Sequence, residues 1–235
     1  MSLFGVSGYI NSANSNKPVI KVDNLEISQS EFNYMLQKEL SKLKDMDSAN
    51  PEEAEARKAE ISAELAKIKL DDLLLENTMK KFADTVRRLL SIALNLFIVW
   101  AEPIALPMSW DWGKEQMFIF YTEDSNILSA CICAMVAVGQ LVCIFTGREL
   151  PRWLHTLKYI ATCCLTMTFL TVVFILAPYY KDEGGVVFLL TASSMLYHHL
   201  LNPLCAFVSF VFLEREPRLS GKNVFCALIP TLLYG

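Results

Sequence analysis

The hydrophobic and polar positions of this chain follow two patterns, and the change between them falls at Arg88. Before Arg88, apolar residues recur singly among polar ones, at the spacing of helices and strands with one solvated face. After it, apolar residues run almost unbroken for a dozen or more positions at a time. The first pattern is typical of a chain in water and the second of a chain in lipid. We therefore predict an aqueous module over residues 1–88 and a membrane-embedded part over residues 89–235.

Local signals divide the aqueous module into one strand and a set of helices. Residues 19–22 are predicted to form a short strand, and residues 23–24 a turn. Ser28, followed three residues later by Glu31, forms a capping box, so a helix should begin there. A second helix is predicted to begin at Pro51, because proline is favoured at the first helical position. The apolar positions that follow these two starts at helical spacing are Phe32, Met35, Leu36, Leu40 and Leu43, and then Ile61, Leu65, Ile68, Leu73, Leu75, Met79 and Phe82.

Five apolar stretches follow, and a helix needs about 20 residues to cross a bilayer. The first four reach that length. The fifth has 12 residues, or about 18 Å of helix, and no polar flank after it, so we expect a span cut in mid-helix. The predicted fold is all-α: a polytopic membrane bundle of four full spans and a truncated fifth, preceded by a small helical module. The stretches are residues 89–110, 125–145, 157–178, 186–213 and 224–235.

The distribution of charged residues supports this division into two parts and argues against one class of function. Residues 1–88 hold 28 of the 46 Asp, Glu, Lys and Arg side chains, and the net charge of −4 divides equally between the two parts. Neither part has the basic excess of a nucleic-acid binder, so no nucleic-acid partner is expected. All seven cysteines follow residue 88 without a CxxC pair. They are predicted to be small packing residues, and we expect no metal and no cofactor.

The loop charges predict an orientation, because cytoplasmic loops of membrane proteins are enriched in Lys and Arg. Acidic residues dominate the two loops at residues 110–124 and 179–185. The N-terminus is therefore predicted to be cytoplasmic, in a multi-pass protein of the bacterial inner membrane. The basic residues that lead to this prediction are Lys80, Lys81, Arg87 and Arg88; Arg148, Arg152 and Lys158; and Arg215, Arg218 and Lys222.

Three segments near the N-terminus resemble a known family: Gly5–Tyr9, Val22–Ser28 and Phe32. They are similar to the start of the periplasmic part of PpiD, a SurA-type folding factor, over residues 3–85. The resemblance implies a helical module that binds unfolded polypeptide. In that family the prolyl isomerase activity belongs to a separate parvulin domain, and residues after 88 do not resemble one.

This resemblance conflicts with the predicted orientation, since the family works in the periplasm. Two explanations remain open. The chain is a fusion of fragments from two proteins, which we expect from the absence of a membrane anchor before Leu3, or the charge rule does not hold for the first span.

Polar side chains inside apolar stretches are functional candidates, because lipid offers them no hydrogen bonds. Thr122 lies at the outer mouth of the second span, and His198 and His199 lie about 12 residues into the fourth. Thr and His can act as nucleophile and general base if they come within about 3 Å. The alternative is structural: Tyr197, His198 and Asn202 bond to neighbouring helices. A metal site is disfavoured, because adjacent histidines on a helix point about 100° apart.

The same residues belong to a second resemblance, which covers residues 87–235. This part of the chain resembles a bacterial integral-membrane family that is distantly similar to the androgen-induced membrane proteins of animals. The animal members hydrolyse fatty-acid esters of hydroxy fatty acids with a Thr nucleophile and a His. The resemblance implies Thr122 as the nucleophile and His198 or His199 as the imidazole. The segments that carry it are Tyr121–Asn126, Lys158–Tyr159 with Ala161–Thr162, Leu165–Leu170, Leu176–Pro178 and His198–His199 with Pro203.

Three functions are therefore predicted. The first is a membrane protein that hydrolyses lipid esters through Thr122 and His198 or His199. The second is a membrane-tethered folding factor that binds unfolded polypeptide through residues 1–88. The third is a structural or interaction protein without catalysis. Membrane lipids are the expected partners in all three.

Overall fold

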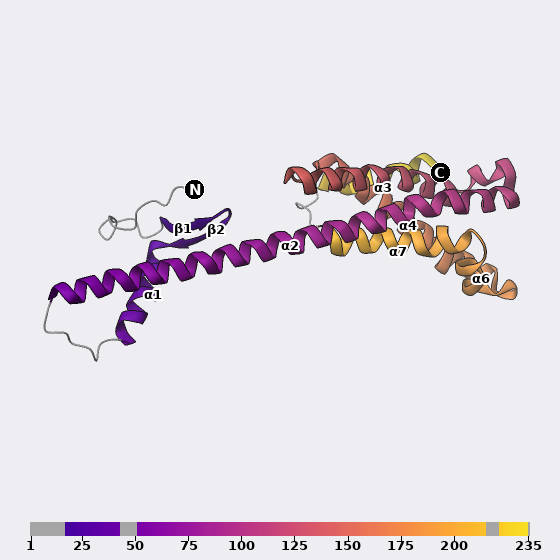
Figure 1. Ribbon diagram of the computed structural model, residues 1–235. Helices are drawn as coiled ribbons and strands as arrows, with labels where there is room; N and C mark the ends of the chain where they lie inside the picture. Colours follow the sequence, from indigo (N-terminus) through magenta and orange to yellow (C-terminus); the bar gives the residue numbers. More distant parts are fainter. Residues whose placement is uncertain (1–16, 43–50, 215–220, 235) are drawn as a thin grey trace. The chain divides into compact units, whose positions relative to one another are not determined.

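The computed structural model describes residues 17–42, 51–214 and 221–234. The chain divides into two compact units, residues 1–83 and 84–235, and the boundary lies within the helix α2, Pro51–Gly113 (Figure 1). Both units are dominated by helices, so the predicted all-α fold is confirmed, with one small hairpin as the only sheet among the described residues.

Unit 1, residues 1–83, pairs a β-hairpin with two helices. The strands β1 (Pro18–Val22) and β2 (Leu25–Ser28) are antiparallel, with Val22 opposite Leu25 at the turn. The helix α1 (Gln29–Lys42) begins as predicted, because the Glu31 amide donates to Ser28 Oγ over 3.3 Å. The strand β2 was not predicted. The core of the unit consists of Ile20, Ile27, Phe32, Leu65 and Leu73.

Asp23 closes the hairpin and fastens it to α2. Its backbone has a φ of 52°, a conformation that Asp and Asn tolerate better than most residues. Its carboxylate accepts a hydrogen bond from Asn77 Nδ2 at 2.9 Å and lies 2.7 Å from Lys81 Nζ. The hydrogen bond from Lys81, together with that from Asn77, lowers the pKa of Asp23 below its usual value.

A pH dependence of the hairpin follows from this lowered pKa. The stabilising contribution of Asp23 should be fully present above about pH 3.9, the unfolded value, and disappear as the pH falls through the lower folded value. The protection of the hairpin amides against hydrogen exchange, measured against pH, should therefore decrease at acidic pH. Asp23→Asn keeps the turn conformation and should remove that decrease. An equal decrease in both proteins would contradict this role of Asp23.

Unit 2, residues 84–235, contains three of the long apolar helices and the end of the first, which begins in unit 1. Four helical segments among the described residues are long and apolar enough to cross a membrane: Glu52–Ile119, Tyr121–Thr146, Arg152–Tyr179 and Leu196–Leu213. The elements after α2 are η1 (Lys114–Ile119), α3 (Tyr121–Thr146), α4 (Arg152–Thr171), η2 (Val172–Leu176), α5 (Ala177–Tyr179), η3 (Lys181–Glu183), α6 (Gly185–Thr191), η4 (Leu196–Leu201), α7 (Asn202–Val208), η5 (Ser209–Leu213), α8 (Gly221–Cys226) and α9 (Ile229–Tyr234).

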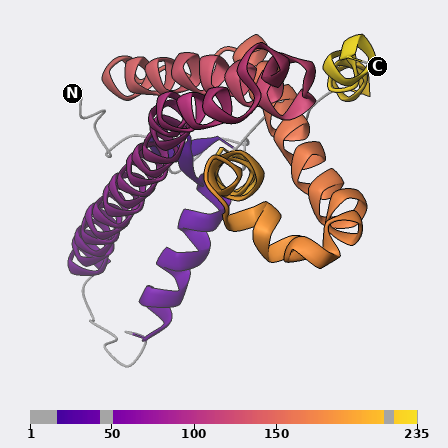
Figure 2. The same cartoon turned by 90° about the vertical axis from the view of Figure 1, so that its right-hand side faces the viewer.

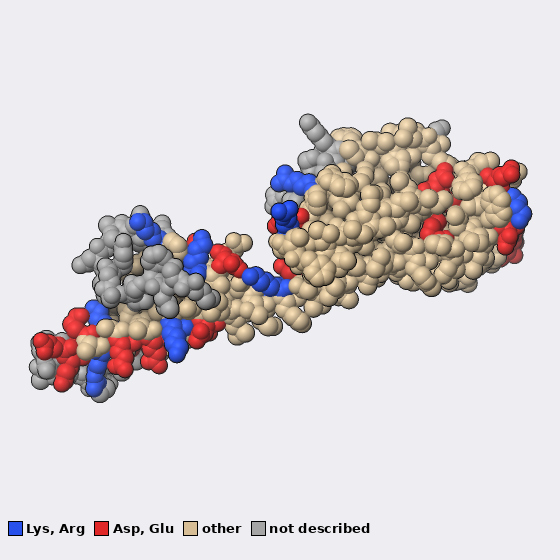
Figure 3. Space-filling view, turned by 45° about the horizontal axis from the view of Figure 1, so that its top comes forward, with Lys and Arg blue, Asp and Glu red and all other residues tan. Residues whose placement is uncertain are grey.

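The four apolar segments meet in a common core. Figure 2 looks along α7, which lies among α2, α3 and α4. One buried apolar cluster takes a residue from each segment, and two from α3: Ile98, Ala130, Cys133, Leu165 and Ala206. On the face shown in Figure 3, charged side chains gather towards the two ends of unit 2 and leave an uncharged band between them. An uncharged belt of this kind is what a bilayer-spanning bundle requires.

The fourth apolar stretch differs from the prediction of one helix over residues 186–213. The helix stops at Thr191, and Ala192 is extended. Ser193 has a φ of 49°, and helix resumes at Leu196 with the wide turn η4. Pro203 contributes to the wide turn η4, since it has no N–H to donate to a carbonyl one turn earlier. The two histidines therefore lie close to the start of a new helix and not at the middle of a continuous one.

The location predicted for Lys158 from the sequence is also wrong. It was predicted to belong to a basic loop between the second and third spans. The structure places it in the second turn of α4, with no exposed surface. The apolar stretch defined from the sequence began near Lys158, whereas the helix begins five or six residues earlier, at Arg152.

Candidate functional site

A cavity of about 330 Å³ lies inside unit 2, between the end of α2 and the starts of α3 and η4. All three residues predicted as a catalytic site line it: Thr122, His198 and His199. Glu123 lines it as well. The remaining walls are mostly apolar and come from η1 and the residue after it, the end of η2, α6 and the segment between α6 and η4, among them Met117, Phe120, Leu176, Phe188, Leu189 and Met195.

Two asparagines hold Thr122 and His198 beside each other. Asn126 Nδ2 donates to the Thr122 carbonyl at 2.8 Å and reaches the His198 carbonyl at 3.4 Å. Asn202 Nδ2 in turn donates to Asn126 Oδ1 at 2.9 Å. Both asparagines are completely buried, where a broken hydrogen bond is costly. The start of α3 is thus fixed against η4 by polar contacts. The predicted structural role of Asn202 is confirmed by its bond to Asn126 on the neighbouring helix α3.

His198 lies between two carboxylates. Its Nε2 is 3.4 Å from Glu102 Oε2, and its Nδ1 is 3.9 Å from Glu123 Oε1. Glu102 comes from α2 and is only 6% exposed. Glu102 stands inside the first apolar stretch of the sequence, at residues 89–110, and the sequence pattern assigned it no role. The missed signal was a lone carboxylate in an apolar stretch, which is costly without a partner.

His199 has a defined tautomer. Its Nδ1 is 2.7 Å from the Leu189 carbonyl, and a carbonyl oxygen only accepts hydrogen bonds. The hydrogen therefore sits on Nδ1, and Nε2 has the free lone pair that a general base needs. His198 has a carboxylate near each ring nitrogen. The two carboxylates hold its ring in place, so His199 is the better candidate for the group that accepts a proton.

The cavity brings together the Thr122 hydroxyl, two imidazoles and the Glu123 carboxylate, and the Glu102 carboxylate lies next to His198. This set contains the parts of a nucleophile, a base and a group that orients the base. Within the described part of the chain, Thr122 Oγ has no hydrogen bond to either imidazole. Catalytic contacts are often long before substrate binds, so this geometry is compatible with catalysis.

A second buried polar cluster ties all four apolar segments together, and the sequence prediction missed it. Lys158 Nζ on α4 donates to Asn95 Oδ1 on α2 at 2.5 Å. Asn95 Nδ2 reaches Glu214 Oε1, just after η5, at 3.3 Å. Ser91 Oγ donates to the same oxygen at 3.0 Å. It accepts in turn from Gln140 Nε2 on α3, also at 3.0 Å. We call Ser91, Asn95, Gln140, Lys158 and Glu214 the lysine network.

Burial dominates the electrostatics of Glu214. It raises the pKa of this carboxyl, while the nearby Lys158 side chain and the hydrogen bonds from Ser91 and Asn95 act in the opposite direction. This arrangement could hardly be predicted from the sequence. Glu214 stands at the end of an apolar stretch, where a charged residue usually faces water.

Comparison with known proteins identifies only the N-terminal part. Residues 1–87 match the family model of the SurA-like N-terminal domain. This match confirms the predicted resemblance of that segment to SurA-type folding factors. No curated protein and no solved structure matches the chain. The resemblance of residues 87–235 to the androgen-induced membrane proteins stays a prediction.

Proposed function

We propose that the chain is a membrane-tethered folding factor whose SurA-like unit 1 binds unfolded polypeptide. The observation that supports this most directly is an apolar surface on α2 that the described residues of unit 1 leave exposed. We call Ile68, Leu75, Met79 and Phe82 the apolar stripe; Leu75, Met79 and Phe82 are 58–65% exposed.

The apolar stripe is a continuous face of one helix. Its members are seven, four and three residues apart, so they lie along one side of α2. The core residue Leu73 projects from another side of α2 and packs, together with Leu65, against the hairpin and α1. In this segment α2 therefore has two apolar faces, and only one is used for folding. Contiguous apolar surface of this kind is typical of a binding site for another chain.

The tether is provided by unit 2. Its four apolar segments meet the length and composition needed to cross a bilayer, and α2 runs from unit 1 into the first of them. Helices with this composition are stable in lipid because every backbone group is bonded within the segment. Which side of the membrane carries unit 1 stays a prediction.

The apolar stripe is tested by replacing Leu75, Met79 and Phe82 together with glutamine. A buried large apolar side chain is worth about 1.5–3 kcal/mol, and tenfold in affinity is about 1.4 kcal/mol. Even partial burial of three such side chains predicts an affinity loss of at least about tenfold. The measurement is fluorescence anisotropy of a labelled, permanently unfolded polypeptide with the full chain in nanodiscs.

The matched control is Glu76→Gln with Lys80→Gln, an exposed ion pair of 2.8 Å on the same turns of α2. This variant should bind the polypeptide like the unsubstituted chain at moderate salt, because exposed pairs contribute little. Equal affinity of the stripe variant and the control, or no binding by the unsubstituted chain, would contradict the proposed function.

The cavity of unit 2 supports a second candidate function, the hydrolysis of lipid esters. The observation that favours it is that Thr122, His198 and His199 line one cavity, with carboxylates beside His198. In this reaction His199 Nε2 takes the proton of Thr122 Oγ while Oγ bonds to the ester carbonyl carbon. The bond to the alcohol oxygen breaks, and the alcohol leaves with that proton. Water then hydrolyses the acyl-threonine and restores the hydroxyl. The experiment is hydrolysis of fatty-acid esters by the purified chain, with Thr122→Ala as the inactive variant.

A further inference from the structure

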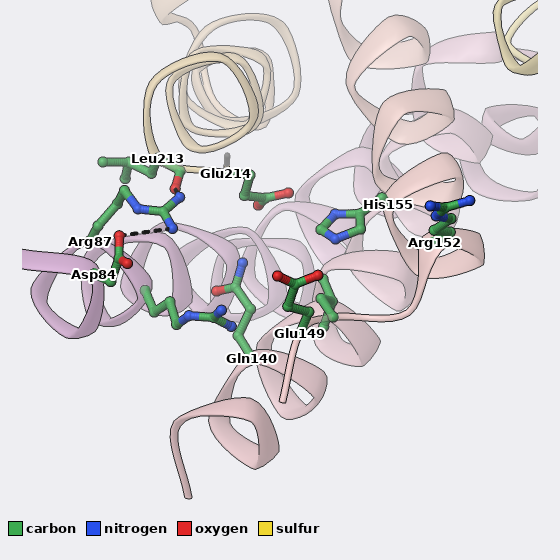
Figure 4. Close-up of a pocket in the computed structure, with 10 residues that line it drawn as sticks. Asp84, Arg87, Gln140, Glu149, Arg152, His155, Leu213 and Glu214 are labelled. Atoms are coloured by element: carbon green, nitrogen blue, oxygen red, sulfur yellow. Dashed lines mark hydrogen bonds and ion pairs between the residues drawn. The ribbon is translucent and has the colours of Figure 1, made fainter. Parts of the chain in front are cut away.

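A second cavity, of about 460 Å³, opens beside the lysine network in unit 2 (Figure 4). Its polar lining contains three arginines, three carboxylates, one glutamine and one histidine. A volume of this size lies within the usual range for small-ligand sites. The polar residues that line it are Asp84, Arg87, Arg88, Gln140, Glu149, Arg152, His155 and Glu214.

The position of this cavity corresponds to the surface of a bilayer. It lies where all four apolar segments end on one side: before the apolar run that begins at Leu89, near the end of α3 at Thr146, at the start of α4 at Arg152, and at the end of η5 at Leu213. Lipid headgroups occupy this level of a membrane.

Two side chains that line the cavity are held by hydrogen bonds, and each has one acceptor oxygen without a donor among the described residues. Glu214 Oε1 is held by Ser91 and Asn95, and Gln140 Nε2 is bonded to Ser91. Glu214 Oε2 and Gln140 Oε1 are buried and have no hydrogen-bond partner among the described residues. Both side chains are more than nine-tenths buried. A buried acceptor without a donor is costly, so a donor from a bound molecule is expected there.

The positive charge in the lining of this cavity comes from arginine side chains. Arg88 and Arg152 bring guanidinium groups to its lining, and Arg87 is fixed by hydrogen bonding to the Leu213 carbonyl. A guanidinium group matches the oxygens of a phosphate in a planar, two-point contact. The cavity thus offers cations for a phosphate and fixed acceptors for a nitrogen donor.

We propose that this cavity binds the headgroup of a phospholipid that has both a phosphate and a primary ammonium, as in phosphatidylethanolamine. The arginines bind the phosphate, and the free oxygens of Glu214 and Gln140 accept the ammonium hydrogens. The acyl chains lie along the apolar surface of the bundle. A trimethylated ammonium has no hydrogen to donate, and a glycerol headgroup has no positive charge, so both should bind more weakly.

The test uses the full chain, purified in detergent and exposed to equal amounts of phosphatidylethanolamine, phosphatidylcholine and phosphatidylglycerol. Native mass spectrometry measures which lipid remains bound. We expect a preference for phosphatidylethanolamine of at least about tenfold. Glu214→Gln should reduce that preference over phosphatidylcholine, and Arg88→Gln with Arg152→Gln should reduce retention of all three lipids. Equal retention of the three lipids by the unsubstituted chain would overturn the proposal.

Soluble phosphoethanolamine distinguishes a lipid from a free ligand. Displacement of bound phosphatidylethanolamine by an excess of phosphoethanolamine supports recognition of the headgroup. Binding of phosphoethanolamine by a chain that retains no lipid would assign the cavity to a soluble molecule and overturn the lipid proposal. Neither outcome depends on polypeptide binding by unit 1.

Discussion

Replacement of Lys158 by leucine is expected to lower the free energy of unfolding of unit 2 by about 3–5 kcal/mol, the usual cost of removing one partner of a buried charged pair. Lys158 has no exposed surface, and among the described residues it is linked to the carboxylate of Glu214 through Asn95. Without Lys158, the buried Asn95 oxygen loses its donor and Glu214 loses the nearby positive side chain. A lowering of the thermal unfolding temperature on the order of 10 °C should follow.

The lysine network provides its own controls for this measurement. Lys158→Leu combined with Glu214→Gln should recover part of the loss, because the second change removes the buried charge that the first leaves behind. Lys181→Gln removes an exposed lysine from η3 and should change the unfolding temperature by no more than about 2 °C. If Lys158→Leu were as stable as Lys181→Gln, Lys158 would not join the four apolar segments.

Replacement of Thr122 by alanine is expected to lower ester hydrolysis by at least about 10³-fold, because it removes the oxygen that would form the acyl intermediate. Thr122→Ser keeps a hydroxyl at the same position and should keep measurable activity. Thr166→Ala is a matched control, since the Thr166 hydroxyl donates to the Thr162 carbonyl of its own helix and to no other described residue. The measurement is initial rates of fatty-acid release by the purified chain in nanodiscs.

The two histidines should differ in the same assay. His199→Gln removes the ring nitrogen with the free lone pair and should lower the rate by about 10²–10⁴-fold, the usual contribution of a general base. His198→Gln removes a group held between Glu102 and Glu123 and should also destabilise unit 2. If His199→Gln retained full activity while Thr122→Ala lost it, His199 would not be the base. If neither Thr122→Ala nor His199→Gln had any effect on a measurable hydrolysis, the cavity would not be its site.

Local features of this fold could be predicted because their causes are local. The capping of α1 by Ser28 and the turn at Asp23 each depend on residues within a few positions of one another. The strand β2 could not be predicted in the same way. It has four residues, and its pairing with β1 is decided by the packing of Ile20 and Ile27 against Leu65 and Leu73, which lie far along the chain.

The buried polar residues were harder to predict, because hydropathy shows that a segment is apolar but not which way its polar side chains face. Lys158 and Glu214 stand close to the ends of apolar stretches. Lys158 was predicted to lie in a basic loop, and Glu214 was left unassigned. Glu102 was assigned no role. Each is buried because another segment supplies its partner, and that pairing is a property of the folded bundle.

Thr122 and the two histidines were singled out because hydroxyl and imidazole groups are uncommon in apolar stretches and because of a family resemblance. The sequence could not show that they line one cavity, since Thr122 is more than seventy residues from His198. It also could not show the break at residues 192–195, which no proline or glycine marks. That break brings Leu189 to His199 and thereby fixes the tautomer of the imidazole.

The proposal of a membrane-tethered folding factor is tested most directly by site-specific photo-cross-linking of the full chain in nanodiscs to an unfolded polypeptide. A cross-linker at Met79 lies in the apolar stripe, and one at Lys80 lies on the neighbouring exposed side of the same helix turn. The predicted result is strong cross-linking from position 79, little from position 80, and competition by excess unlabelled unfolded polypeptide but not by a folded protein. Equal cross-linking from both positions, or none from position 79, would contradict the proposed function.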